Sequence, residues 1–236
     1  MGKIVGLIPA RMESTRFPGK PIIDIYGVPM VVRVFNQAKK CAFLDEVYIC
    51  TDSEIIAQTA KEHHCKVILT TSNPQNGTER CAEALELLND TFDYIINIQG
   101  DEPNIAPQQI EQICKLLAEE KHEIVTLGIE IKDKQDFTKN NIVKAILDKN
   151  DFAIDFERNI DLADTKKILK HIGIYGFKTA ILKSIVKMKP TTNEIIKSLE
   201  QMRWLDNGIE IKVGITNFES IAIDLPDDIQ KLKKYY

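Results

Sequence analysis

The densest group of residues that could bind phosphate follows the first apolar run of the chain. Residues 4–8 are apolar, and the segment after them holds three cations, Arg11, Arg16 and Lys20, and the hydroxyl of Ser14. Ligands of open α/β sheets bind beyond the carboxyl ends of the strands, and Arg and Lys are the side chains that pair with phosphate oxygens. The segment therefore predicts a buried strand that ends in a polyphosphate site.

This segment does not have the spacing of a P-loop. That loop requires G-x-x-x-x-G-K-[ST], whereas here only one glycine, Gly19, precedes Lys20, and Pro21 follows it. Side chains rather than a nest of backbone N–H groups must therefore hold the charge. The alternative is a solvent-exposed turn, since runs of charged residues usually face water.

A carboxylate suited to a divalent cation follows the apolar run at 94–98. Asp101 has Gly100 before it and Pro103 two residues after it, which predicts a rigid turn at the ligand edge of the sheet. Mg²⁺ usually takes one or two carboxylates plus substrate phosphates, so a second carboxylate should come from elsewhere in the chain. Capping of the helix that begins near Pro107 is the alternative role for Asp101, and Asn104 or Ala106 is better placed for it.

The elements that would position these groups alternate between strands and helices. Apolar runs predict strands at 46–50, 66–69 and 94–98, and apolar residues at helical spacing predict helices at 29–41, from 54 onward and after the turn at 76–80. Asp52 or Ser53 is predicted to cap the second helix, and Thr78 the third. This order predicts an α/β fold with parallel strands joined by right-handed crossovers.

The pattern changes after residue 124 to extended stretches that extend or flank the main sheet. In the strand 171–177, alternation places His171 and Tyr175 on one face, a wall for a polyhydroxylated ligand, although a single strand histidine is more often structural. Residues 193–207 predict one helix, with Trp204 at a subunit contact. The remaining predictions are strands at 125–131, 141–147 and 210–215, a strand that ends at 221–226, and a last helix at 227–234, for which Asp224 is a candidate cap.

Composition narrows the class of protein. The 236 residues carry 31 basic and 35 acidic side chains, a net charge of -4, which argues against nucleic acid or an anionic membrane as partner. We expect a cytoplasmic protein, because no signal peptide and no run of 18 apolar residues is found. The five cysteines show no C-x-x-C pairing, which agrees with a reducing, cytoplasmic environment. The segment His63-His64-Cys65 is not a predicted zinc site, because no second pair of ligands follows it.

Six segments, taken together, resemble the CMP-Kdo synthetases, the bacterial 3-deoxy-manno-octulosonate cytidylyltransferases. They are IPARMESTRFPGKP at 8–21, NGTERCAEA at 76–84, NIQGDEP at 97–103, HIGIYGF at 171–177, LEQMRW at 199–204 and IDLPDDI at 223–229. The resemblance implies a Rossmann-like, mostly parallel sheet of nucleotidyltransferase (GT-A-like) type. It also implies a single domain over 1–236, in which roughly 124–215 form a smaller part for sugar binding and dimerisation.

The same resemblance implies an activity and a set of residues. CTP and Kdo, or a close analogue, would give a CMP-sugar for lipopolysaccharide synthesis and pyrophosphate, with Mg²⁺ on Asp101 and Asp224 and with a homodimer as the working form. The catalytic residues would be Arg11, Lys20, Asp101 and Asp224. The nucleotide site would comprise Pro9, Ala10, Arg11, Ser14, Arg16, Lys20, Thr51, Asp52, Gly77, Thr78, Arg80 and Gln99, and the sugar site Gln99, Glu157, Arg158, His171, Tyr175, Glu200 and Gln201.

One departure from the family pattern concerns the sugar. Glu157 stands where the family has a serine, and alternation places it on the same strand face as Asp155. Two carboxylates beside an anionic sugar acid would call for a cation, which predicts an amino-substituted sugar such as 8-amino-3,8-dideoxy-manno-octulosonate. The alternative is that both carboxylates face solvent or form an ordinary ion pair with Lys166 or Lys167.

Two other functions were weighed against the enzyme. A dinucleotide-dependent oxidoreductase lacks its fingerprint, because no G-x-G-x-x-G follows a predicted strand. A non-catalytic nucleotide-binding module stays open, although such a protein need not keep both the phosphate-binding cations and the metal-binding carboxylates.

Overall fold

A nine-stranded mixed sheet forms the centre of the computed structural model, which describes residues 2–13, 17–119, 121–160 and 167–235. Seven strands lie side by side in the order β11, β7, β10, β6, β1, β4, β5. Their bounds are β1 Ile4–Pro9, β4 Glu46–Thr51, β5 Val67–Leu69, β6 Tyr94–Asn97, β7 Ile124–Glu130, β10 Lys167–Lys178 and β11 Ile211–Ile215. Of these seven, only β10 runs antiparallel to its neighbours, which agrees with the expected mostly parallel sheet.

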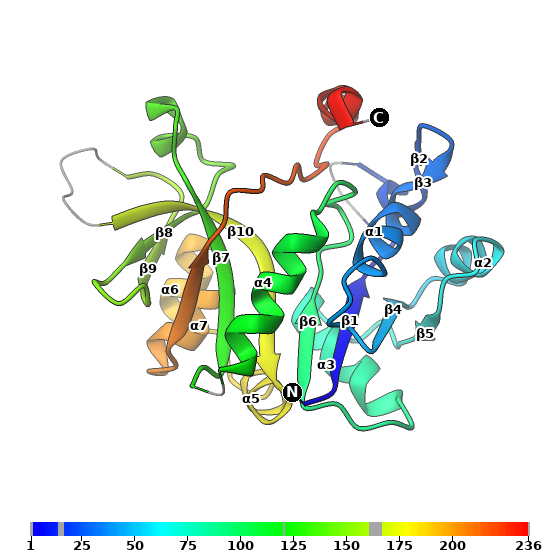
Figure 1. The fold of residues 1–236 in the computed structure, drawn as a ribbon, viewed down its shortest axis with the longest axis horizontal. Coiled ribbons are helices and arrows are strands. Elements are labelled where there is room, and N and C mark those ends of the chain that lie inside the picture. The colour runs from blue at the N-terminus through cyan, green and yellow to red at the C-terminus, as the bar shows by residue number, and fades with distance from the viewer. Residues whose placement is uncertain (1, 14–16, 120, 161–166, 236) are drawn as a thin grey trace.

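The two remaining strands extend the sheet on the side of β10. β8 (Lys144–Leu147) pairs with one end of β10, and β9 (Ala153–Glu157) pairs with β8, all antiparallel. Figure 1 shows that β10 is long and curved, so that its start joins β8 and its end joins the parallel half of the sheet. This strand therefore carries residues from the later part of the chain to the edge of β6.

Helices cover both faces of the sheet (Figure 1). One apolar core joins the sheet to α1 (Met30–Ala38), α2 (Glu54–Glu62) and α4 (Pro107–Ala118). The other joins it to α3 (Gly77–Leu87), α5 (Thr179–Ile185) and α7 (Gln201–Asp206). The parallel strands are buried on both faces, which is why their sequences are continuous apolar runs rather than alternating ones.

A third, smaller core lies beyond the carboxyl end of β1. It joins the loop after β1 to the hairpin of β2 (Asp24–Ile25) and β3 (Val28–Pro29) and to the C-terminal end of the chain. That end consists of α8 (Asp228–Lys231) and the short 3₁₀ helix Leu232–Tyr235. The buried residues of this third core are Phe17, Ile25, Met30, Ile223 and Leu232.

Four local predictions were wrong. Residues 193–207 form two helices, α6 (Thr192–Lys197) and α7, which are separated at Ser198. Trp204 is only 1% exposed and packs edge-on against Tyr175 and Phe177 in the second core, not at a subunit contact. Residues 221–224 have no regular secondary structure, and 225–226 form a bend and a turn instead of the end of a strand. The last α-helix is shorter than expected because it continues as a 3₁₀ helix.

Within the described part of the chain, no helix is both long enough and apolar enough to cross a bilayer.

Candidate active site

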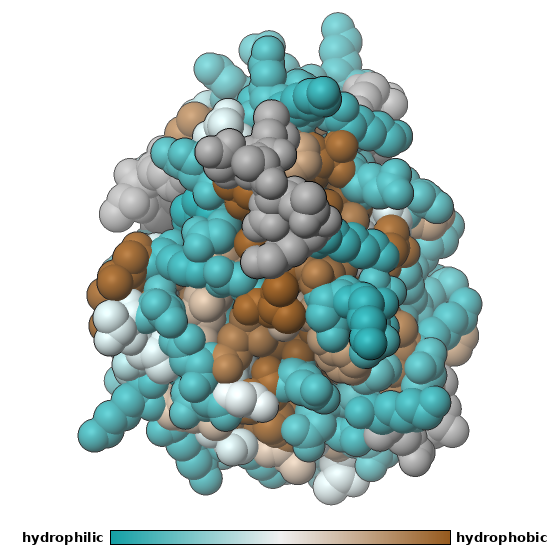
Figure 2. Space-filling model, turned by 90° about the vertical axis from the view of Figure 1, so that its left-hand side faces the viewer, coloured by the Kyte–Doolittle hydropathy of each residue, from teal (hydrophilic) through white to brown (hydrophobic). Residues whose placement is uncertain are grey.

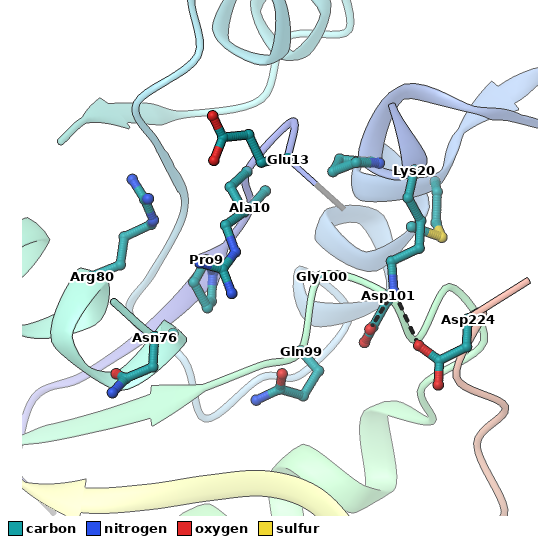
Figure 3. A pocket seen from close by; sticks show the side chains of 14 residues that line it. Pro9, Ala10, Glu13, Lys20, Asn76, Arg80, Gln99, Gly100, Asp101 and Asp224 are labelled. Carbon is teal, nitrogen blue, oxygen red and sulfur yellow. Dashed lines mark hydrogen bonds and ion pairs between the residues drawn. The ribbon is translucent and has the colours of Figure 1, made fainter. Parts of the chain in front are cut away.

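A cavity of about 500 Å³ opens beyond the carboxyl ends of β1 and β6, where ligands of open α/β sheets bind (Figure 3). It lies between the loop after β1, the start of α3, the turn after β6 and the segment before α8. Its lining residues are Pro9, Ala10, Arg11, Glu13, Lys20, Pro21, Met30, Asn76, Gly77, Arg80, Gln99, Gly100, Asp101 and Asp224. The residues predicted from four separate sequence segments therefore meet in one place.

Lys20 lies between the two predicted metal-binding carboxylates. Its Nζ is 2.8 Å from Asp101 Oδ2 and 3.5 Å from Asp224 Oδ1, as Figure 3 shows. The backbone reinforces this arrangement, because the N–H of Ile223 donates to the carbonyl of Asp101 over 2.9 Å. Asp224 is not the cap of the last helix, because Asp227 takes the N-cap position of α8. Asp228, in the first turn of that helix, accepts the N–H groups of Asp224 and Leu225.

The two carboxylates fit a divalent cation. Both reach one positive charge, and carboxylate oxygens are the ligands that Mg²⁺ prefers. Among residues 2–13, 17–119, 121–160 and 167–235, no group of three or more His, Cys, Asp or Glu side chains is arranged to hold a metal. An ion here would therefore share its remaining coordination with water and with phosphate oxygens, as Mg²⁺ commonly does.

Two arginines lie on the opposite side of the cavity from Lys20. Arg11 is exposed and its Nη1 donates to the carbonyl of Gln75 over 3.2 Å. Arg80 is buried, and its Nη1 lies 2.5 Å from Thr70 Oγ1 and 3.3 Å from Asp52 Oδ1. Both also line a second hollow of about 260 Å³, together with Met12, Glu13, Asp52, Ser53, Ser72 and Pro74.

Not every predicted nucleotide residue reaches these hollows. Thr51 is fully buried and its Oγ1 accepts the N–H of Ser53, which itself caps α2 as predicted. Ser14 and Arg16 lie outside the described residues. Glu13, Met30 and Asn76 line the cavity although sequence reasoning did not select them. For Asn76 a signal existed, since Asn before Gly-Thr-Glu is typical of a helix N-cap.

Two glycines let three segments converge on the end of β1. A methyl group on Gly100 would lie 2.8 Å from the carbonyl oxygen of Pro9, and one on Gly77 would lie 3.1 Å from the Pro9 ring. The turn after β6 and the first turn of α3 can therefore pack against Pro9 only if these positions lack a side chain. This close packing brings Asp101 and Asn76 to the cavity.

Thr78 connects the cavity to the later part of the chain. It is not the helix cap, because Asn76 Oδ1 accepts the N–H of Glu79 over 2.8 Å and takes that role. The Thr78 hydroxyl instead donates to Glu200 Oε2 over 2.9 Å. Thr78, predicted for the nucleotide site, is therefore hydrogen-bonded to Glu200, predicted for the sugar site.

His171 and Tyr175 share one face of β10, as predicted, with ring centroids 5.4 Å apart. Burial lowers the pKa of His171 to about 3, so the imidazole is neutral at neutral pH, and its Nε2 lies 2.9 Å from Thr126 Oγ1. Burial, and then the charge of Glu200, raises the pKa of Tyr175. Neither residue lines the cavity, but Gly173 between them lies against Gln99, which does.

Glu157 and Arg158 also lie outside the cavity lining. Lys197 Nζ is 2.7 Å from Glu157 Oε1 and 2.5 Å from Asp155 Oδ1. The cation that these carboxylates require is therefore Lys197, while Lys167 pairs with Asp151 and Lys166 lies outside the described residues. With Lys197 as their partner, these two carboxylates do not require an amino group on the sugar.

Two glutamates, the half-buried Glu200 and the buried Glu102, have carboxyl groups whose pKa is raised. Burial raises the pKa of Glu200 to about 7, against opposing contributions from Thr78 and Arg203. Burial likewise raises the pKa of Glu102 to about 7; this residue follows Asp101 and was not selected from the sequence. Gln201, the neighbour of Glu200, is 6% exposed.

The fold and the site together define a nucleotidyltransferase: an α/β sheet with cations and two carboxylates at its ligand edge. The family model described as cytidylyltransferase matches residues 5–211, and the chain belongs to that family.

Similar proteins extend over nearly the whole chain. The 3-deoxy-manno-octulosonate cytidylyltransferase of Parabacteroides distasonis is 40% identical, covering 98% of this chain and 97% of its own, and that of Thermodesulfovibrio yellowstonii is 40% identical, covering 97% and 96%. A solved CMP:2-keto-3-deoxy-manno-octonic acid synthetase complexed with CTP superposes with a TM-score of 0.91 at 30% identity, covering 99% of this chain and 98% of that one.

The raised pKa of Glu200 predicts how stability depends on pH. The folded protein keeps this proton up to about pH 7, whereas the unfolded chain releases it near pH 4.3. The folded state therefore binds more protons between these values, and the contribution of Glu200 to the free energy of unfolding falls as pH rises from about 4.5 to about 7 and is constant above.

Glu200→Gln should remove this contribution. Urea unfolding at intervals from pH 4.5 to 8 should show a flatter profile for the variant, with at most about 1.4 kcal/mol per pH unit to lose for one proton. Glu102 should still give the variant some slope of the same sign. Parallel profiles for the two proteins would mean that the Glu200 carboxyl titrates normally in the folded state.

Proposed function

We propose that the protein is a 3-deoxy-manno-octulosonate cytidylyltransferase, which transfers CMP from CTP to the anomeric hydroxyl of Kdo and releases pyrophosphate. The observation that carries this proposal is the convergence of Lys20, Asp101 and Asp224 at one end of a cavity whose other side holds Arg11 and Arg80. The substrates are those named for the full-length relatives and for the CTP-bound synthetase.

The distribution of charge suits a nucleoside triphosphate. Arg11 and Arg80 border both hollows, and Lys20 lies across the main cavity near the carboxylates. Guanidinium and ammonium groups form their strongest hydrogen bonds with phosphate oxygens. We place the base and ribose toward the smaller hollow and the start of α3, and the phosphates toward Lys20.

The sugar acid would lie on the side of β10. Gln99 lines the cavity, and a methyl group on Gly173 would lie 3.5 Å from the Gln99 side chain. His171 and Tyr175 flank Gly173 on β10, and Glu200 accepts the hydroxyl of Thr78. Neutral imidazole, phenol and a carboxyl with a raised pKa are suitable partners for hydroxyl groups. A wall of this kind would orient the sugar's anomeric hydroxyl toward the phosphates.

The transfer needs positioning and charge neutralisation rather than a protein nucleophile. The sugar hydroxyl attacks the α-phosphorus, a new P–O bond forms, the bond to the β-phosphate oxygen breaks, and the hydroxyl proton is released. Asp101 and Asp224 would hold Mg²⁺, which when bound neutralises charge on the phosphates. Arg11 and Lys20 stabilise the charge that moves onto pyrophosphate as it leaves.

Pyrophosphate release tests this proposal. The four nucleoside triphosphates should be combined in turn with Kdo, 8-amino-3,8-dideoxy-manno-octulosonate and a sialic acid. We expect turnover with CTP and Kdo, whose product would supply lipopolysaccharide synthesis. Nucleotide binding without pyrophosphate release for every sugar would instead indicate a binding module.

Asp101→Asn and Asp224→Asn should each lower turnover by roughly a hundredfold or more, because each removes one negative charge from a shared cation site. The steady-state rate at saturating CTP and Kdo, measured over a series of Mg²⁺ concentrations, is the test. Thermal unfolding should show that both variants stay folded. Turnover near the wild-type value at high Mg²⁺ would show that these carboxylates do not hold the metal.

Lys20→Met should lower kcat/KM for CTP by roughly a hundredfold, as expected for the loss of a charge-assisted contact in a closed site. Methionine keeps the aliphatic part of the side chain, so packing against the loop is preserved. Arg33→Met provides a control, because Arg33 donates to the carbonyls of Ile25 and Tyr26 and does not line the cavity. Equal effects of the two substitutions would argue against a role of Lys20 in CTP binding.

We further propose that two copies associate through the face formed by β8, β9 and α6. Figure 2 shows apolar surface in the middle of this face, bordered by polar side chains, and Ile195 and Ile196 of α6 are 68% and 75% exposed. Apolar patches with polar borders are typical of protein interfaces. Light scattering should give twice the chain mass for the wild type and a lower mass for Ile196→Glu.

A further inference from the structure

The break between α6 and α7 requires a physical explanation. Residues 193–207 contain neither proline nor glycine, and their apolar spacing favours one continuous helix. The chain nevertheless turns at Ser198, which adopts φ 52° and ψ 50°. This left-handed conformation is unfavourable for a residue with a Cβ, so contacts from elsewhere in the protein must hold it.

Arg158 supplies part of that hold. Its Nε donates to the carbonyl of Lys197 and its Nη2 to the carbonyl of Ser198, each over 3.2 Å, and its Nη1 donates to Asn140 over 3.1 Å. The carbonyls at the end of a helix lack partners within the helix. Arg158 therefore satisfies acceptors that a continuous helix would have paired internally.

An ion-pair cluster around Lys197, the residue before Ser198, also holds the turn in place. Lys197, the last residue of α6, directs its Nζ to Asp155 and Glu157, which project from the same face of β9. The Lys197 side chain is 18% exposed, and each carboxylate is 34% exposed. We call Asp155, Glu157, Arg158 and Lys197 the corner clamp.

The residues that the clamp controls belong to the sugar side of the site. Glu200 follows the corner by two residues and accepts the hydroxyl of Thr78. Arg203 of α7 donates to both carboxylate oxygens of Glu194 of α6, over 2.7 and 2.6 Å, which fixes the angle between the helices. With both ends fixed, the conformation of Ser198 decides where the Glu200 carboxyl lies relative to α3.

We propose that Glu157, acting through Lys197, is a positioning residue for the sugar site: the corner clamp holds Ser198 in its left-handed conformation and so places Glu200 against Thr78. This inference rests on the function proposed above. It assigns Glu157 an indirect role in place of direct contact with the sugar. A partly exposed ion pair adds little to global stability, so the clamp should affect the sugar step more than the unfolding temperature.

Glu157→Gln and Lys197→Met, singly and together, test the proposal. Each should raise KM for Kdo by about tenfold, equivalent to about 1.4 kcal/mol, while KM for CTP stays within about twofold. The double variant should be no worse than either single one, because both act through one contact. Glu46→Gln is the control, since Glu46 forms a comparable pair with Lys66 at the far end of β4.

The fluorescence of Trp204 gives a readout that does not depend on activity. It is the only tryptophan of the chain, it lies in α7 and it is almost fully buried. Both clamp variants should shift its emission, and the control should not. This shift would be seen even if the wild type released no pyrophosphate, so failure of the proposed function and failure of the clamp are distinguishable.

Rescue completes the test. Glycine adopts the left-handed conformation without the Cβ penalty. Ser198→Gly in the Glu157→Gln background should therefore reverse part of the rise in KM for Kdo. A rise in KM with Glu157→Gln but not with Lys197→Met, without a change in emission, would indicate that Glu157 contacts the sugar directly and would overturn the proposal. Unchanged KM in both variants, or no rescue by glycine, would also overturn it.

Discussion

The meeting of one ammonium group with two carboxylates is the interaction on which the site depends. Asp101 and Asp224 both lie within 3.5 Å of Lys20 Nζ, although they come from different segments of the chain. Two carboxylates brought this close repel each other unless a positive charge lies between them. Lys20 provides that charge in the protein itself, and it keeps the carboxylates converged in a form to which a divalent cation and a triphosphate can bind.

This convergence depends on a segment without regular secondary structure. After β11 the chain runs above α4 to α8 (Figure 1), and its backbone is held by side chains rather than by a strand. Asn104 Oδ1 accepts the N–H of Ile221, and Gln109 Nε2 donates to the carbonyl of Phe218. Ile223 is fully buried in the third core beside Phe17. The core that anchors Asp224 therefore also anchors the loop that carries Lys20.

The sugar side has a different kind of support. There the proposed sugar site is built from the hydrogen bond between Thr78 and Glu200 and from the rings of His171, Tyr175 and Trp204, which pack in tilted and edge-on pairs. Desolvation makes the Glu200 carboxyl costly to ionise, so its position must be well defined by its neighbours. The corner clamp would meet that requirement, and it would make β9 part of the site without any contact between β9 and the substrates.

The sequence by itself determined the α/β class, the alternation of β1, α1, β4, α2 and β5, and the placement of Lys20 and Asp101 after strand ends, because strand periodicity and turn residues are local signals. Only the tertiary structure decided the break at Ser198, the burial of Trp204, the irregular path to Asp224 and the pairing of Glu157 with Lys197. Each of these results from contacts between residues distant in sequence. Such contacts outweigh local propensity, because burial and paired charges contribute more free energy than the helix preference of a single residue.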